Sequence, residues 1–115
     1  FRALGLRRAQ AAAGSVTLTA ADNGTLFLCT AAATFTTPTL AEGLSYGFVM
    51  LADANLVISS AGSSDNIIAD GDAGADTVTY STSSHKIGSA ALLFSLPDAT
   101  KWVSLNVGAT AATVA

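Results

Sequence analysis

Apolar and polar side chains alternate along much of the chain in the pattern of short β-strands. Near the start, Val16 and Leu18 alternate with Ser and Thr residues, and Phe35 lies in a run of threonines that ends at Pro38. Between these two segments, Asp22-Asn23-Gly24 has the composition of a tight reversal. Alternation with a period of two, interrupted by such turn residues, indicates antiparallel strands joined by hairpins.

The rest of the chain continues this pattern. Short apolar or alternating runs occupy residues 44–51, 56–59, 77–80, 90–96 and 101–107, and Leu92, Phe94 and Leu96 share one face of their run. About eight or nine short strands at regular spacing, with no convincing helical pattern between them, indicate an all-β domain. We therefore expect a single antiparallel β-sandwich or barrel-like domain of jelly-roll type over residues 15–115.

Residues 1–14 differ from this body and are predicted to form an N-terminal arm, either extended or as one short helix. The alanines of residues 9–13 favour the helix, and Gly14 would end it. A helix this short is marginal in water, so the arm is expected to take its shape from whatever it packs against.

The charge distribution suggests a protein-binding role for the arm. Only 11% of the 115 residues are charged, which is typical of a surface that meets other protein. Three of the five basic residues lie in the first eight positions, whereas the body is acidic. The residues predicted to contact a partner or a neighbouring copy are Phe1, Arg2, Leu4, Leu6, Arg7 and Arg8. The acidic body argues against nucleic acid as the partner, and no apolar run is long enough to span a membrane.

The acidic segment of residues 70–76 is the best candidate for a ligand site. Asp70, Asp72 and Asp76 could converge on a hard cation such as calcium. However, the twelfth position of a calcium-binding loop that began at Asp70 is Ser81, which is not the acidic ligand required there. The segment is therefore predicted to be a solvated surface loop, with no metal and no cofactor.

No arrangement typical of an enzyme is found in the sequence. His85 follows several serines, but adjacent strand residues point to opposite faces and no G-x-S-x-G motif is present. The single cysteine, Cys29, lies in an apolar run and is expected to be buried. Trp102 and Phe94 are expected to be core residues or anchors between subunits. The chain is therefore predicted not to be an enzyme.

Several segments together resemble the small β-domains of tailed bacteriophages. The matching positions are Asp22-Asn23-Gly24, residues 35–38, 43–51 and 56–59, and Trp102. The resemblance covers most of residues 15–108 and excludes the arm. It implies a virion structural protein, a head decoration (cement) protein on the outer capsid surface. Such a protein binds the major capsid protein as a homotrimer and stabilises the head by bridging capsid subunits.

Two other functions remain open at this stage. The first is a receptor- or glycan-binding β-module of a phage tail fibre or spike, which the same resemblance allows. The second is a small enzyme, which ranks last because the sequence lacks a nucleophile paired with a base. The short chain and its distinctive arm favour the decoration protein.

Overall fold

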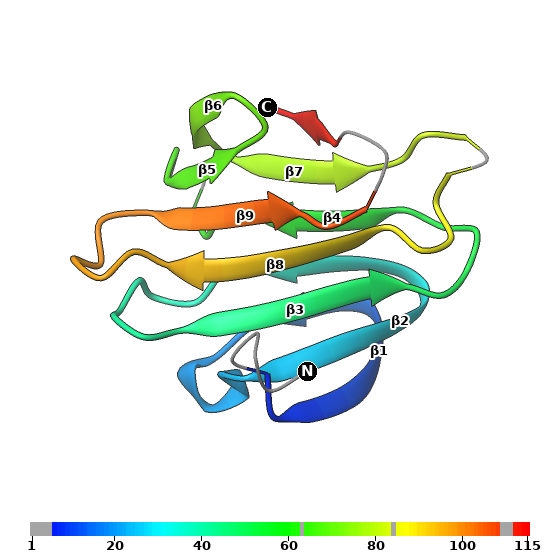
Figure 1. Ribbon diagram of the computed structural model, residues 1–115, viewed down its shortest axis with the longest axis horizontal. Helices are drawn as coiled ribbons and strands as arrows, with labels where there is room; N and C mark the ends of the chain where they lie inside the picture. The colour runs from blue at the N-terminus through cyan, green and yellow to red at the C-terminus, as the bar shows by residue number, and fades with distance from the viewer. Residues whose placement is uncertain (1–5, 63, 84, 109–111) are drawn as a thin grey trace.

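The computed structural model describes residues 6–62, 64–83, 85–108 and 112–115, which form an all-β fold (Figure 1). One mixed sheet of ten strands curls into a nearly closed barrel-like shape, without an α-helix in the described part of the chain. The strands are β1 (Arg8–Thr17), β2 (Thr25–Thr36), β3 (Ser45–Met50), β4 (Leu56–Ser59), β5 (Ile67–Ala69), β6 (Asp72–Ala75), β7 (Thr77–Tyr80), β8 (Ala90–Ser95), β9 (Trp102–Asn106) and β10 (Thr113–Val114). The all-β prediction is confirmed.

The strand directions differ from the sequence-based expectation. The order in the sheet is β10-β7-β4-β2-β3-β8-β9-β5-β6, with β1 on β2. β2 runs parallel to β1, β3 and β4, and β5 runs parallel to β9, so the sheet is mixed and not antiparallel. The barrel-like closure fits the expected fold class, but the topology is not clearly that of a jelly-roll sandwich. Alternation predicts which residues share a face, but it carries no information on strand direction.

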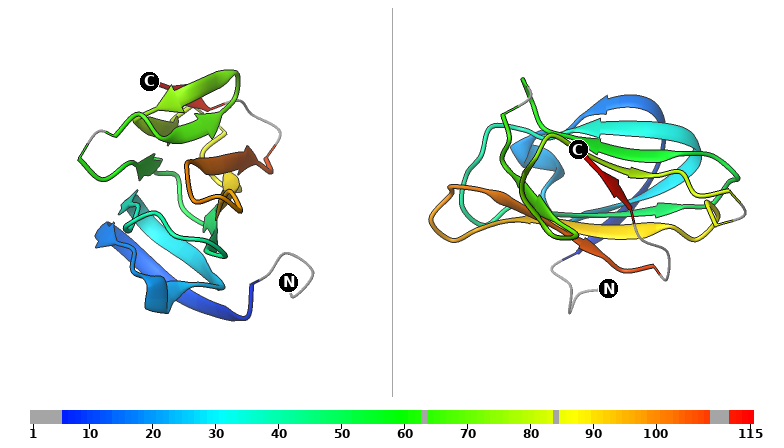
Figure 2. Two further views of the ribbon diagram at one scale, coloured as in Figure 1. Left: turned by 90° about the vertical axis from the view of Figure 1, so that its left-hand side faces the viewer. Right: turned by 90° about the horizontal axis from the view of Figure 1, so that it is seen from above.

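The long strand β2 divides the sheet into two layers. Its first part, from Thr25 to Cys29, pairs with β3, and its second part, from Ala33 to Thr36, pairs with β4. Between these two parts the β1–β2 register shifts, and Gly14 of β1 has a φ of 72°, which favours glycine. The β1–β2 ribbon therefore bends from one side of the molecule to the other (Figure 2).

We call the strands β3, β8, β9 and β5, with the first part of β2, the front layer, and the strands β4, β7 and β10, with the second part of β2, the back layer (Figure 2). Between the layers, the rings of Phe27, Phe35 and Phe48 pack with centroids 4.5–5.7 Å apart. Trp102 of β9 is fully buried, and its ring centroid lies 6.1 Å from that of Tyr46. Aromatic residues from both parts of β2 thus join the layers into one core.

The arm is a strand from Arg8 onward. β1 begins at Arg8 and runs through Gly14 to Thr17, so the helical alternative is wrong for residues 8–13. Parallel hydrogen bonding to β2 pairs one side of this backbone and overrides the helix propensity of its alanines. The residues Phe1, Arg2 and Leu4 of the predicted contact set lie outside the described residues.

Two predicted turns also have a different structure. Asp22-Asn23-Gly24 does not close a hairpin, because the strands on either side of it, β1 and β2, are parallel. Residues 70–76 are not a simple loop, because β5 and β6 form a hairpin there. Asp70 and Gly71 join these two strands with φ values of 37° and 91°. Positive φ at both central positions is the requirement of a tight type I′ turn, which Asp-Gly meets well.

Candidate interaction surfaces

The described residues of the arm have three different environments. Leu6 is only 2% exposed and lies against the outer side of β3, over Gly47. The Arg8 guanidinium donates to the Ala21 carbonyl at 2.7 Å and to the Thr25 hydroxyl at 3.0 Å, so it is held by its own chain. Arg7 is exposed and lines a polar hollow of about 320 Å³ with residues of the 23–24 and 43–45 segments. Of these three side chains, Arg7 is exposed and has no hydrogen bond among the described residues.

The strand β1 is exposed along nearly its whole length. Eight of its ten residues are exposed and the other two, Ala12 and Val16, are half-buried. β1 pairs with β2 on one side, and no strand of the described chain pairs with its other side. Beyond Arg8 and Gln10, its residues are small and uncharged. An edge strand of this kind can hydrogen-bond to another chain, because residues 9–17 contain no charge or proline of the sort that usually blocks such edges.

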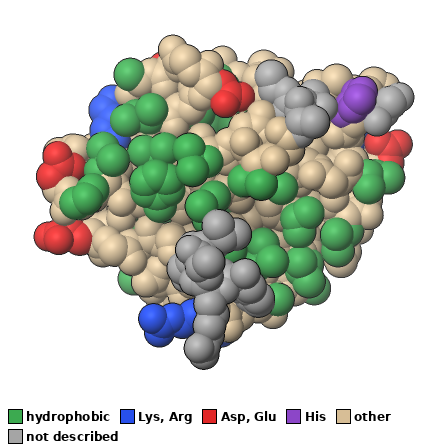
Figure 3. All heavy atoms as spheres, viewed as in Figure 1, with side chains coloured by type: hydrophobic (Ala, Val, Ile, Leu, Met, Phe, Trp, Pro, Cys, Tyr) green, Lys and Arg blue, Asp and Glu red, His purple; other side chains and the backbone are tan. Residues whose placement is uncertain are grey.

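The outer surface of the front layer, which we call the front face, is almost entirely apolar. Leu26, Gly47, Leu92 and Leu105 lie side by side on four neighbouring strands. Similar rows lie on each side of this one. Together the outward positions are Leu26, Leu28, Ser45, Gly47, Val49, Ile68, Ala90, Leu92, Phe94, Val103, Leu105 and Val107. Hydrophobic side chains gather over this face in Figure 3, with charged groups at its border.

The outer surface of the back layer, which we call the back face, has a different composition. Its outward positions are Thr34, Thr36, Val57, Ser59, Thr77, Thr79 and Thr113. Thr34, Val57, Thr79 and Thr113 form one row across four strands. Hydroxyl groups on this face can hydrogen-bond to water, which is the usual arrangement for a solvated sheet.

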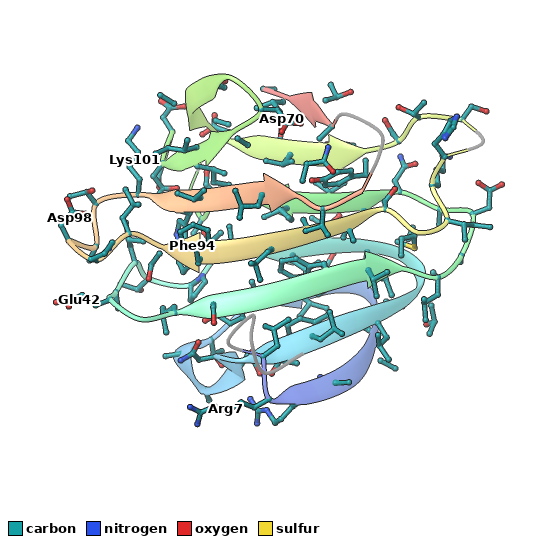
Figure 4. All side chains as sticks on the ribbon, viewed as in Figure 1. Arg7, Glu42, Asp70, Phe94, Asp98 and Lys101 are labelled. Carbon is teal, nitrogen blue, oxygen red and sulfur yellow. The ribbon has the colours of Figure 1, made fainter. Side chains whose placement is uncertain are left out.

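The front face could not be identified as a surface from the sequence pattern. Leu92 and Phe94 lie on one face, as predicted, but Phe94 points outward from the sheet (Figure 4), whereas Leu93 is buried in the core. The signal is the unbroken apolar run of residues 90–94, which puts apolar side chains on both faces of β8. Such a run also fits a strand buried on both sides, so the pattern does not distinguish the two cases. Trp102 is a core residue, as one of the two expected alternatives proposed.

The acidic segment uses its carboxylates within its own chain. Asp70 accepts from the Ala112 amide at 3.1 Å, Asp72 from the Gly74 amide at 2.8 Å and Asp76 from the Asp65 amide at 2.9 Å. No group of three His, Cys, Asp or Glu side chains in the described chain has an arrangement that could hold a metal ion. The three carboxylates thus stabilise turns around the β5–β6 hairpin.

Cys29 and His85 are the other candidate chemical groups that the structure describes. Burial raises the pKa of the Cys29 thiol to about 11, so this side chain is protonated at neutral pH, as expected for a buried apolar-like residue. The His85 backbone is held in a turn: its amide donates a hydrogen bond to the Thr82 carbonyl, and its carbonyl accepts one from the Ser89 hydroxyl. Ser84 lies outside the described residues.

Comparison with protein-family models, curated proteins and solved structures finds no match to this chain. Among the described residues, there is no helix of the length and hydropathy needed to cross a membrane. The surfaces themselves, an exposed strand edge and an apolar face, are therefore the basis on which a function is proposed.

Proposed function

We propose that this chain is a capsid decoration (cement) protein of a tailed bacteriophage, which binds the outer surface of the head and bridges major capsid subunits. The observation that carries the proposal is β1, a mostly exposed strand with an unpaired outer edge in the described chain. The low charge of the chain and its resemblance to small phage β-domains support the same role. The proposed activity is binding, without catalysis.

The hydrogen bonds of β1 indicate which amides are available to a partner. The Arg8 amide donates to the Gly24 carbonyl and the Leu18 amide donates to the Thr36 carbonyl, so even-numbered amides point toward β2. Because backbone amides alternate in direction along a strand, those of Ala9, Ala11 and Ser15 point outward. An extended segment of a capsid subunit could add to this edge as a further strand, a common mode of peptide recognition.

Arg7 supplies the charge for this contact. It is exposed directly before β1, while Arg8 is bound to its own chain. A carboxylate of the partner placed beside Arg7 would form a charge-assisted contact at the end of the added strand. A protein that binds only the assembled shell stabilises that shell by mass action.

The test is binding of the purified chain to heads that lack it. The Ala11→Pro variant removes one outward amide without removing a β1–β2 hydrogen bond, and should weaken binding by about tenfold, the equivalent of about 1.4 kcal/mol. The Ala11→Thr variant keeps the amide and should bind like the wild type. Arg7→Glu should weaken binding more at low salt than at high salt.

Equal binding by Ala11→Pro and Ala11→Thr would show that the β1 edge is not the contact. No binding of the wild-type chain to any phage head would overturn the proposed function itself. Circular dichroism and thermal unfolding of each variant separate a loss of contact from a loss of fold.

A second candidate function is a glycan-binding module of a tail fibre or spike. The observation that favours it is the polar hollow beside Arg7, because sugars are bound through hydrogen bonds. However, the Asn23 side chain there already bonds to the Gly43 carbonyl at 3.1 Å and the Ser45 amide at 2.7 Å. Saturable binding of an oligosaccharide that Arg7→Ala abolishes would favour this function over decoration.

A further inference from the structure

Asn23 and Gly24 form the one Asn-Gly pair of the sequence, and this pair has a chemistry of its own. Asparagine is a thermally labile residue, because its side chain loses ammonia when the backbone nitrogen of the next residue attacks its Cγ atom. Glycine in that next position has no side chain to hinder the attack. The other three asparagines precede the bulky residues Leu56, Ile67 and Val107. Asn23 is therefore the asparagine of this chain that is most reactive by its sequence context.

The fold uses the Asn23 side chain to hold two segments together. Its Oδ1 atom accepts a hydrogen bond from the Ser45 amide at 2.7 Å, and its Nδ2 group donates to the Gly43 carbonyl at 3.1 Å. The Gly24 amide donates to the Ser45 carbonyl at 2.8 Å. We call these three hydrogen bonds the Asn23 clasp. It joins the turn of residues 22–24 to the start of β3, although Asn23 itself is exposed.

The Asn23 clasp keeps the reacting atoms out of the arrangement that the reaction needs. Ring closure requires the Gly24 nitrogen to lie nearly eclipsed with Asn23 Cβ about the Cα–C bond, whereas a ψ of 133° at Asn23 turns it well away. Gly24 is also buried, and its carbonyl accepts hydrogen bonds from the Arg7 and Arg8 amides. Rotation into the reactive arrangement would break the Gly24–Ser45 hydrogen bond. The closed clasp therefore opposes the reaction of a residue that water can reach.

We propose that Asn23 is a modification site, at which the chain deamidates when the Asn23 clasp opens. In the open segment the Gly24 nitrogen gives up its proton and bonds to Asn23 Cγ. The Cγ–Nδ2 bond breaks, and Nδ2 leaves as ammonia with that proton. Water then adds to a carbonyl carbon of the succinimide ring, which opens to aspartate or isoaspartate at position 23. No atom is oxidised or reduced.

The modification prevents the clasp from closing again in its original form. A carboxylate at position 23 can accept from the Ser45 amide, but it has no hydrogen to donate to the Gly43 carbonyl and meets it as a second acceptor. Isoaspartate also lengthens the backbone next to Gly24. The 43–45 segment before β3 is thus released. Capsid binding has no part in this chemistry, so the site is tested independently of the proposed function.

The first experiment measures deamidation of the full chain by peptide mass spectrometry at mildly alkaline pH, both folded and unfolded in guanidinium chloride. In the unfolded chain Asn23 should convert before the other three asparagines. In the folded chain it should convert at least tenfold more slowly, because it waits for a local opening. Equal rates in the two states would overturn the proposal, and so would another asparagine that converts first in the unfolded chain.

Two variants of Ser45 test the clasp itself. Ser45→Pro removes the amide that holds Asn23 Oδ1, and proline is tolerated at the first residue of a strand, which Ser45 is in β3. Deamidation of the folded variant should be at least about fivefold faster than in the wild type, as the loss of one hydrogen bond implies. Ser45→Ala keeps the amide and should convert within about twofold of the wild type. Equal rates for the two folded variants would contradict a role of the clasp.

Hydrogen exchange of the wild-type chain decides the matter even if Ser45→Pro does not fold. The Ser45 and Gly24 amides should be slowed, relative to the unfolded chain, by the same factor as Asn23 deamidation to within about threefold. A Ser45 amide that exchanges at the unfolded rate beside a slowly converting Asn23 would exclude clasp opening as the controlling step.

The Asn23→Asp variant tests the effect of the product. Its melting temperature should be about 3–6 °C below that of the wild type, because the hydrogen bond to the Gly43 carbonyl is lost and a carboxylate takes its place. The 43–45 amides should also exchange faster in this variant. An unchanged melting temperature with unchanged exchange would show that the modification releases nothing, and the proposed consequence would be wrong.

Discussion

The two outer faces of this molecule differ in chemistry although they belong to one sheet. β2 contributes to both, with Leu26 and Leu28 on the front face and Thr34 and Thr36 on the back face. Its inward residues, by contrast, are apolar in both parts except for the buried Thr25. The core therefore requires the same kind of side chain from each layer, whereas the outer positions are free to differ. The layer with hydroxyl groups is suited to water and the apolar layer is suited to protein.

The largest expected effect on stability comes from substitutions in the core that the two layers share. Phe48→Ala in the front layer and Ile58→Ala in the back layer each remove a side chain that is at most 1% exposed. Each should lower the free energy of unfolding by about 3–4 kcal/mol, because a cavity is left in a common core. Urea denaturation at pH 7 measures both changes.

The matched controls are the outward neighbours on the same strands, Val49→Ala and Val57→Ala. Each should cost less than about 1 kcal/mol in the monomer, because these side chains are half-buried. If Ile58→Ala costs no more than Val57→Ala, the back layer does not share the core and the comparison fails.

An intermediate effect is expected where Leu6 covers the front face. Leu6→Ala should lower the free energy of unfolding by about 2 kcal/mol, because the buried side chain that packs over Gly47 is lost. Gly47→Ala should cost about 1–2 kcal/mol, because its methyl group displaces Leu6. In the double variant the second substitution should add little, since Leu6 is already gone.

The back-face control is Ser59→Ala, an outward position of β4 that should be nearly neutral. Strict additivity of the Leu6 and Gly47 substitutions in urea denaturation would show that the two residues do not interact. The front face would then be more open than the structure indicates.

The smallest effect distinguishes two buried tyrosines, one from each layer. The Tyr46 hydroxyl of β3 donates to the Thr19 carbonyl at 2.8 Å, whereas the Tyr80 hydroxyl of β7 has no hydrogen-bond partner among the described residues. Tyr46→Phe should therefore cost about 1 kcal/mol, and Tyr80→Phe should be neutral or stabilising. Thermal unfolding at pH 7 compares the two variants, and a larger loss for Tyr80→Phe would contradict the assignment.

The stability of the fold at alkaline pH provides a second comparison of Tyr46 and Tyr80. Burial, with a smaller effect of Asp22, raises the pKa of Tyr46 to about 12, and burial, followed by Asp70, raises that of Tyr80 to about 12. The nearby Ser104 hydroxyl lowers the pKa of Tyr80 slightly and so offsets part of this rise, although the two hydroxyl groups do not form a hydrogen bond of ordinary geometry. Between about pH 10 and 12 the folded state binds more protons than the unfolded state, so stability should fall as the pH rises through this window.

Each Tyr→Phe variant should lose part of this alkaline fall, as measured by the melting temperature from pH 9 upward. Because burial is the main cause at both sites, the two variants should flatten the curve to a similar extent. A variant whose alkaline curve matches that of the wild type would show that its tyrosine titrates as in the unfolded chain.

The sequence by itself determined the all-β class and the burial of Cys29. These follow from local alternation, because a strand places every second side chain on the same face. The exposed arginine before β1 was also in the predicted contact set, but the burial of Leu6 over Gly47 could not be predicted, because it joins residues far apart in the chain.

Only the tertiary structure decided the parallel pairing of β2, the strand conformation of residues 8–14 and the difference between the two outer faces. Each depends on which distant segment supplies the neighbouring backbone, and hydrogen bonds between strands are not encoded in a period of two. The alanines of β1 favour a helix locally, yet β2 offers them hydrogen-bond partners along one side of the strand. In the same way, residues 90–94 are apolar throughout, and only the sheet decides that Leu93 faces the core and Leu92 faces outward.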